Sequence, residues 1–192
     1  MQAGGGALGV SKGEVVGAGE SNTGSSIDGG RRRRATIKMF PHRDVDAARR
    51  VVQGLPAGQR KLLITDGVFS MDGDLGALPD LCAAAEEFGC IMMVDDAHAS
   101  GVFGENGRGT VDHFGMHGRV DIQVGTLSKA IGALRGYVAG HRAFIDFLHP
   151  PARPFLFPPS HPPPLPPPRI PAPSSLPPAP HPPPPPRPPH RP

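Results

Sequence analysis

Two short, largely apolar runs in the middle of the chain are each followed at once by polar side chains. The first run covers residues 90–94 and the second covers residues 120–124. Runs of this length, bounded by polar residues, are typical of strands buried on both faces in a parallel sheet. The polar residues that follow them are Asp95, Asp96, His98, Thr126 and Lys129. The chain must therefore adopt a fold that gathers these groups at strand ends.

Helical patterns alternate with the strand-like runs. Residues 45–52 have helical periodicity behind Asp44, a suitable N-cap, and residues 78–88 end at Gly89, a common helix stop. The remaining predicted elements are strands at 61–65 and 136–139 and a helix at 141–148. Alternation of this kind favours an α/β fold with a mostly parallel sheet and flanking helices.

The polar residues after the strands suggest a cofactor site. Ligands of parallel sheets bind outside the carboxyl ends of the strands. The candidates there are Ser70, Asp95, His98, Thr126 and Lys129. A carboxylate, an imidazole, hydroxyls and an amine suit pyridoxal 5′-phosphate, because a carboxylate can keep the pyridine nitrogen protonated and an amine can bind the aldehyde.

Four sequence blocks resemble those of a known enzyme family. They cover residues 65–74, 95–98, 107–110 and 125–132 and read TDGVFSMDGD, DDAH, GRGT and GTLSKAIG. In this order and spacing they resemble the α-oxoamine synthases, which are fold-type-I pyridoxal-phosphate enzymes of the aminotransferase class I/II superfamily. The resemblance implies that the chain is a fragment of the large domain of such an enzyme.

The resemblance also implies a role for each candidate residue. Lys129 would bind the cofactor covalently, and Asp95 would pair with the pyridinium nitrogen. His98 and Ser70 would approach the ring oxygen of the cofactor, and Thr126 would donate to its phosphate. Lys129 and His98 are the expected catalytic residues.

Two alternatives concern the acidic pair. Asp96 is the less suitable partner for the pyridine nitrogen, because adjacent strand residues face opposite ways. A zinc site built from Asp95, Asp96 and His98 lacks a further strong ligand at a suitable spacing, so no metal is expected.

Asp72 and Asp74 likewise lack the remaining ligands of a calcium loop.

The reaction implied by the resemblance condenses a small amino acid with an acyl-CoA, and intact relatives are homodimers with active sites between the subunits. The family's upstream Gly-rich phosphate loop and its C-terminal small domain have no counterpart here, so we expect little or no turnover by this chain alone. Thr23 stands where the family has a stacking histidine, and Arg135 stands where it usually has glycine.

Composition divides the chain into three parts. Residues 1–34 are rich in Gly, Ser and Arg and are expected to be largely disordered or degenerate, and residues 35–149 form the partial cofactor-binding domain. Residues 150–192 hold most of the chain's 27 prolines and are expected to be disordered, with polyproline II character. That segment is either an adaptor for SH3 or WW domains, attached to a non-catalytic enzyme relic, or an unselected extension.

The charge and the apolar content of the chain limit which partners and which compartment are expected. The net charge of +3 comes largely from residues 31–34 and from the proline-rich segment, so nucleic acid is not an expected partner of the core. No apolar run approaches a membrane span and no signal-peptide pattern opens the chain, which favours an intracellular protein, cytoplasmic or organellar. Cys82 and Cys90 lack metal-ligand spacing and are expected to be buried, reduced thiols.

Overall fold

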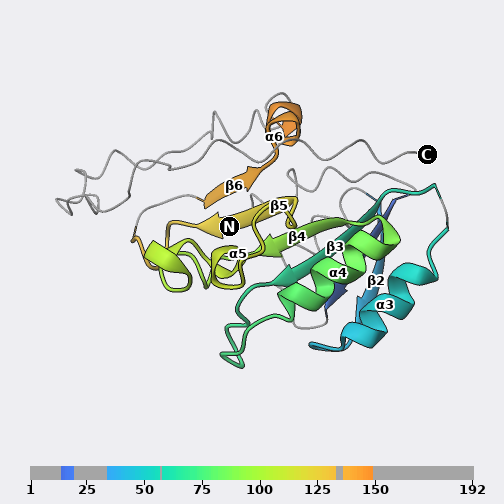
Figure 1. Cartoon of the computed structure of the whole chain (residues 1–192), viewed down its shortest axis with the longest axis horizontal. Coiled ribbons are helices and arrows are strands. Elements are labelled where there is room, and N and C mark those ends of the chain that lie inside the picture. Colours follow the sequence, from blue (N-terminus) through green and yellow to red (C-terminus); the bar gives the residue numbers. More distant parts are fainter. Residues whose placement is uncertain (1–13, 20–33, 57, 133–135, 149–192) are drawn as a thin grey trace.

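A six-stranded β-sheet forms the centre of the part of the protein that the structure describes (Figure 1). The computed structural model describes residues 14–19, 34–56, 58–132 and 136–148. The strands are β1 (Val15–Gly19), β2 (Thr36–Phe40), β3 (Lys61–Asp66), β4 (Ile91–Asp95), β5 (Ile122–Thr126) and β6 (Gly136–Gly140). They lie in the order β2-β1-β3-β4-β5-β6, and all neighbours are parallel except β5 and β6. The predicted α/β fold with a mostly parallel sheet is confirmed.

Local sequence signals explain where the two longest described helices, α3 (Val45–Gln53) and α4 (Leu78–Phe88), begin or end. The other described helices are the short 3-10 helix η1 (Glu105–Gly107), α5 (Thr110–His113) and α6 (Arg142–Leu148). Asp44 caps α3 by accepting a hydrogen bond from the backbone N–H of Ala47 at 2.8 Å. Gly89 ends α4 with a left-handed backbone, φ 62°, which glycine adopts without strain. These two predicted helices are thereby confirmed, and α6 corresponds to the third, predicted at 141–148.

The sheet is packed on two faces by two sets of apolar side chains. On one face α3 and α4 cover the strands (Figure 1). Leu63, Met92 and Val94 are buried in one cluster with side chains of these helices. On the other face Ile64, Met93 and their neighbours form a second buried cluster, which Phe144 of α6 also contacts. Strand residues therefore alternate between two apolar environments, which explains their nearly continuous apolar sequence.

Strands β1 and β2 are not predicted by the hydrophobic pattern. β1 lies inside residues 1–34, the part expected to lack a packed core, yet all five of its residues are buried between β2 and β3. Its sequence, VVGAG, is short and rich in small residues. A Cβ atom at Gly17 would lie 3.3 Å from Leu63 Cδ1, so the small residue fits close packing with the neighbouring strand.

Several sequence-based expectations lie outside the described residues. These are Thr23 at the stacking position, Arg135, most of the arginine run at 31–34, and the proline-rich segment 150–192 with its SH3 or WW partner. Among the described residues, no helix is long and apolar enough to cross a membrane. Cys82 and Cys90 are buried thiols, as expected, and burial raises the pKa of the Cys90 thiol to about 11.

Candidate active site

The carboxyl ends of three neighbouring parallel strands bring polar groups to one edge of the sheet. Asp66 ends β3, Asp95 ends β4 and Thr126 ends β5. Asp66 is directly paired with Asp95, and Asp95 is paired with Val124 of the next strand. The loops after β4 and β5 add His98 and Lys129 at the same edge. This edge is the candidate active site.

Lys129 and His98 are in direct contact. The Lys129 Nζ atom lies 2.7 Å from His98 Nε2, although the two residues come from different loops. An ammonium group can only donate, so with Lys129 charged the imidazole accepts at Nε2 and carries its own proton on Nδ1. Burial, followed by the charge of Lys129, lowers the pKa of His98 below its ordinary value, which favours this neutral imidazole.

The pKa of Lys129 is also lowered, although its side chain remains accessible to solvent. Partial desolvation of the amine is the main cause, and the negative charges of Asp95 and Asp66 oppose it. An amine with a lowered pKa is uncharged more often at neutral pH and is then a nucleophile.

Asp95 is buried beside this pair, with 9% of its surface exposed. Its Oδ1 accepts a hydrogen bond from the backbone N–H of Ala97 at 3.0 Å, and within the described residues no hydrogen bond uses Oδ2. Burial raises the pKa of Asp95, while the Ala97 hydrogen bond and the charge of Lys129 lower it. A buried carboxylate with an oxygen to spare suits a cationic N–H partner.

Asp96 is fully buried and differs sharply from its neighbour. Its carboxylate accepts from Thr110 Oγ1 at 2.5 Å, from the Thr110 backbone N–H at 2.9 Å and from Gln123 Nε2 at 2.8 Å. These donors lie on α5 and β5, on the face of the sheet that α3 and α4 cover. Asp96 therefore ties α5 to the sheet, and its carboxylate is taken up by structural hydrogen bonds.

Thr126 and Ser70 occupy different surroundings. Thr126 is buried at the end of β5, where its Oγ1 lies 2.8 Å from Ser128 Oγ and accepts from the Ser128 backbone N–H at 3.3 Å. Ser70 is exposed in the loop after β3. In the described part of the chain, no hydrogen bond joins Ser70 to the other four candidates. The structure thus brings Lys129, His98 and Asp95 together and places Thr126 on the adjacent strand end, whereas Ser70 makes no hydrogen bond to them among the described residues.

Three further residues at this edge are not among the sequence-based candidates. Asp66 is buried, with 4% of its surface exposed, and its charge acts on Lys129. Ser100 and Tyr137 join the turn after β4 to β6 through hydroxyl groups 2.7 Å apart. Asp66 directly follows the strand predicted at 61–65 and could have been found by the rule that selected Asp95, whereas Ser100 and Tyr137 carry no signal in the sequence.

A separate cluster of His42, Asp72 and Asp74 is the one group of possible metal ligands among the described residues. The short distances within this cluster have another explanation, since Asp74 Oδ2 already lies 3.1 Å from His42 Nε2 and 3.0 Å from Arg43 Nη1. Burial by itself would raise the pKa of Asp74, but the contacts with His42 and Arg43 together lower it. The neighbouring guanidinium disfavours a bound cation.

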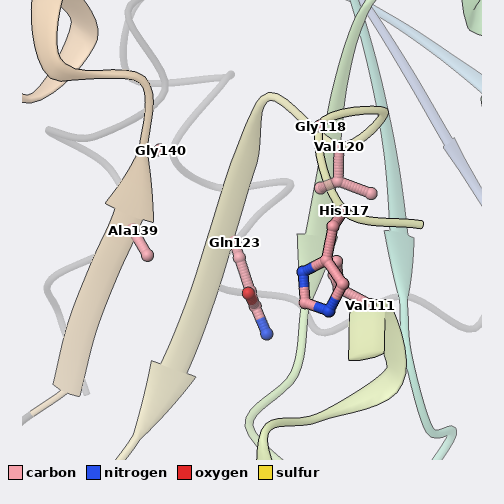
Figure 2. Close-up of a pocket in the computed structure, with 7 residues that line it drawn as sticks. All are labelled: Val111, His117, Gly118, Val120, Gln123, Ala139 and Gly140. Carbon is pink, nitrogen blue, oxygen red and sulfur yellow. The ribbon is translucent and has the colours of Figure 1, made fainter. Parts of the chain in front are cut away.

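A hollow of about 130 Å³ lies beside β5 and the end of β6. Figure 2 shows the side chains that surround it. It is lined by Val111, His117, Gly118, Val120, Gln123, Ala139 and Gly140. Its polar side chains are already engaged: His117 Nε2 lies 2.8 Å from Asp112 Oδ1, and Gln123 donates to Asp96 and to the Arg108 carbonyl. The hollow therefore offers little recognition chemistry of its own.

The profile of the aminotransferase class I and II family matches residues 8–166. The chain belongs to that family. Within it, the 8-amino-7-oxononanoate synthase of Symbiobacterium thermophilum is 55% identical over 154 residues, which are 80% of this chain and 39% of that protein. The 8-amino-7-oxononanoate synthase 1 of Bacillus subtilis is 53% identical over 153 residues, with the same coverage of 80% and 39%.

Solved structures agree with this assignment. The serine palmitoyltransferase of Sphingomonas wittichii superposes with a TM-score of 0.74 at 33% identity, covering 77% of this chain and 38% of that one. The 8-amino-7-oxononanoate synthase of Francisella tularensis gives a TM-score of 0.66 at 27% identity, covering 82% and 45%. The predicted resemblance to the α-oxoamine synthases, with pyridoxal phosphate as the family's cofactor, is confirmed. The chain spans less than half the length of these relatives.

Proposed function

We propose that this chain forms the cofactor-holding edge of a pyridoxal-phosphate-dependent acyltransferase that condenses a small amino acid with an acyl-CoA. The observation that carries the proposal is the contact of 2.7 Å between Lys129 Nζ and His98 Nε2, beside the buried carboxylate of Asp95. The similarity to 8-amino-7-oxononanoate synthases and serine palmitoyltransferase supports the reaction class.

The residues at this edge fit pyridoxal phosphate. Asp95 has a carboxylate oxygen for a pyridinium N–H, and its burial strengthens a charge-assisted hydrogen bond. Thr126 and Ser128 supply hydroxyl groups of the kind that bind phosphate. When bound, pyridoxal phosphate supplies an electron sink for a carbanion at the α-carbon of an amino acid.

Each of the three central residues has a distinct task. Lys129 provides an amine that is deprotonated more readily than an ordinary lysine and can attack a carbonyl carbon. His98 accepts a hydrogen bond at Nε2 and so holds that amine in place. Asp95 places a negative charge where a protonated ring nitrogen would be stabilised, and Ser70, in the exposed loop after β3, would approach the ring oxygen of the cofactor.

A homodimer is part of the proposal. Among the described residues, three large apolar side chains are exposed in the loops at the same edge: Met71 at 93%, Val102 at 63% and Ile131 at 50%. The loops that carry Val102 and Ile131 touch, since a Cβ atom at Gly101 would lie 2.7 Å from Ala130 Cβ. Exposed apolar groups beside a polar site favour coverage by a second copy of the chain.

Titration with pyridoxal phosphate, followed by the absorbance of the cofactor, tests the proposal. In the Lys129→Arg protein the apparent affinity for pyridoxal phosphate should fall about tenfold or more, because arginine cannot form the covalent bond. Lys38→Arg, at an exposed position of β2, is the matched control and should behave as the unaltered chain does. Glycine, alanine or serine should then alter the absorbance of the loaded control. Equal binding by the two variants, or no response to any amino acid, would contradict the proposal.

A further inference from the structure

Tyr137 reaches from the edge strand β6 across β5 to the turn that carries His98. Tyr137 is paired with Gly125 in the antiparallel register of β5 and β6. A Cβ atom at Gly125 would lie 2.5 Å from Cζ of the tyrosine ring and 2.6 Å from its Oη. The ring therefore lies over a position that only glycine can occupy, and its hydroxyl ends 2.7 Å from Ser100 Oγ.

The direction of these hydrogen bonds follows from the groups involved. Ser100 Oγ lies 2.8 Å from the backbone carbonyl of Asp96, and a carbonyl can only accept. Ser100 has a single hydroxyl proton, which it donates to that carbonyl, so Tyr137 must donate its own proton to Ser100. Burial and the nearby charges of Asp96 and Asp95 raise the pKa of Tyr137, which keeps the phenol protonated and able to donate.

The carbonyl at the end of this chain closes the turn around His98. It also accepts from the backbone N–H groups of Ala99 at 3.0 Å and Ser100 at 2.8 Å. His98 lies inside the turn, between Asp96 and Ser100, and its imidazole contacts Lys129. Tyr137 thus links β6 to the position of the imidazole through one buried serine.

We propose that Tyr137 is a positioning residue, which acts through Ser100 to hold His98 in contact with the Lys129 amine. The inference rests on the proposed function, in which that amine binds the cofactor. It gives the antiparallel strand β6 a role in the site, because only the antiparallel return places position 137 opposite Gly125, one residue before Thr126.

Titration of the His98 imidazole by NMR in the cofactor-free protein tests this role. The charged groups around it are Lys129, Asp95 and, through Lys129, Asp66. Tyr137→Phe keeps the ring and removes the hydroxyl, so the turn loosens, His98 leaves Lys129, and its pKa should rise toward the ordinary value of 6.5. Thr36→Val, which removes an exposed hydroxyl in β2, is the control and should leave the His98 titration unchanged.

Ser100→Ala provides a second route to the same result. It should shift the titration of His98 in the same direction, and adding Tyr137→Phe to it should cause no further shift, because both changes break one chain of hydrogen bonds. Circular dichroism shows whether each variant folds. If either Tyr137→Phe or Ser100→Ala does not fold, the His98 titration of the other variant tests the inference. An unchanged His98 pKa in a folded Tyr137→Phe or Ser100→Ala protein would overturn the inference.

A cofactor measurement separates this inference from the proposed function. With the cofactor added, Tyr137→Phe should reduce its covalent attachment to Lys129 about fivefold at subsaturating concentration, the loss expected for one buried hydrogen bond. If the unaltered chain binds no cofactor while Tyr137→Phe still shifts His98, the proposed function fails and the positioning role stands. If the cofactor binds and His98 does not shift, the positioning role fails alone.

Discussion

Asp95 and Asp96 are consecutive in the sequence, but their carboxylates serve opposite sides of the sheet. Asp96 is satisfied by Thr110 and Gln123 on the helix-covered side, whereas Asp95 lies near Lys129 and His98. The alternation of side chains along a strand explains how one acidic pair provides both a structural anchor and a group for the site.

This division predicts different effects of two matched variants. Asp96→Asn should lower the free energy of unfolding by about 1–3 kcal/mol, because the new amide N–H₂ would face the donors of Thr110 and Gln123. Asp95→Asn should change stability much less and should instead weaken cofactor binding. Urea denaturation of the two proteins measures the contrast, and a larger loss of stability in Asp95→Asn would contradict it.

The raised pKa of Asp95 predicts how that variant responds to pH. A carboxyl group with a folded-state pKa above its unfolded value of 3.8 favours the folded state when protonated, and this contribution is lost as pH rises through the folded-state pKa. An amide does not titrate, so the Asp95→Asn protein has no such loss. Its stability relative to the unaltered chain should therefore increase from acidic toward neutral pH. Denaturation of the two proteins at a series of pH values measures this trend. A difference in stability that stays constant with pH would contradict the expectation.

Gly125 is predicted to tolerate no side chain while Tyr137 lies over it. Gly125→Ala should destabilise the protein by about 1–3 kcal/mol, since its Cβ would overlap the tyrosine ring. Gly54→Ala is the matched control, because its Cβ would meet only ordinary contacts, the nearest at 3.4 Å. Thermal unfolding compares the two. Combining Gly125→Ala with Tyr137→Ala should recover part of the loss, and no recovery would place the cause elsewhere.

The exposed apolar loops predict self-association through the edge that holds the site. Val102→Lys and Met71→Lys should shift the chain toward monomer, because a charge would have to be buried in the contact. Met39→Lys, in β2 at the other end of the sheet and 41% exposed, serves as the control. Sedimentation velocity measures the oligomeric state. A monomeric unaltered chain, or equal effects of all three variants, would argue against this dimer.

Much of the central sheet could be predicted because its strands are apolar on both faces and are separated by clear helix signals. Asp95, His98 and Lys129 could be selected because each follows such a strand, and parallel strands end at a common edge. β1 could not be found in this way, since its small residues VVGAG resemble a flexible segment and acquire their burial only from β2 and β3.

The roles of Tyr137 and Ser100 depend on tertiary register. Nothing local to either residue indicates that an antiparallel strand crosses Gly125 and brings the two hydroxyls together. Asp66 is an intermediate case. Its position at the end of β3 is apparent from the sequence, but its closeness to Asp95 follows from the pairing of β3 with β4.

We propose that Lys129 is the amine that binds pyridoxal phosphate. The most direct test is to add the cofactor, reduce the complex with borohydride and map the modified peptide by mass spectrometry. We expect a cofactor label on Lys129, with Lys38 and Lys61 labelled far less. A label distributed evenly over the lysines, or no label on Lys129, would contradict the claim.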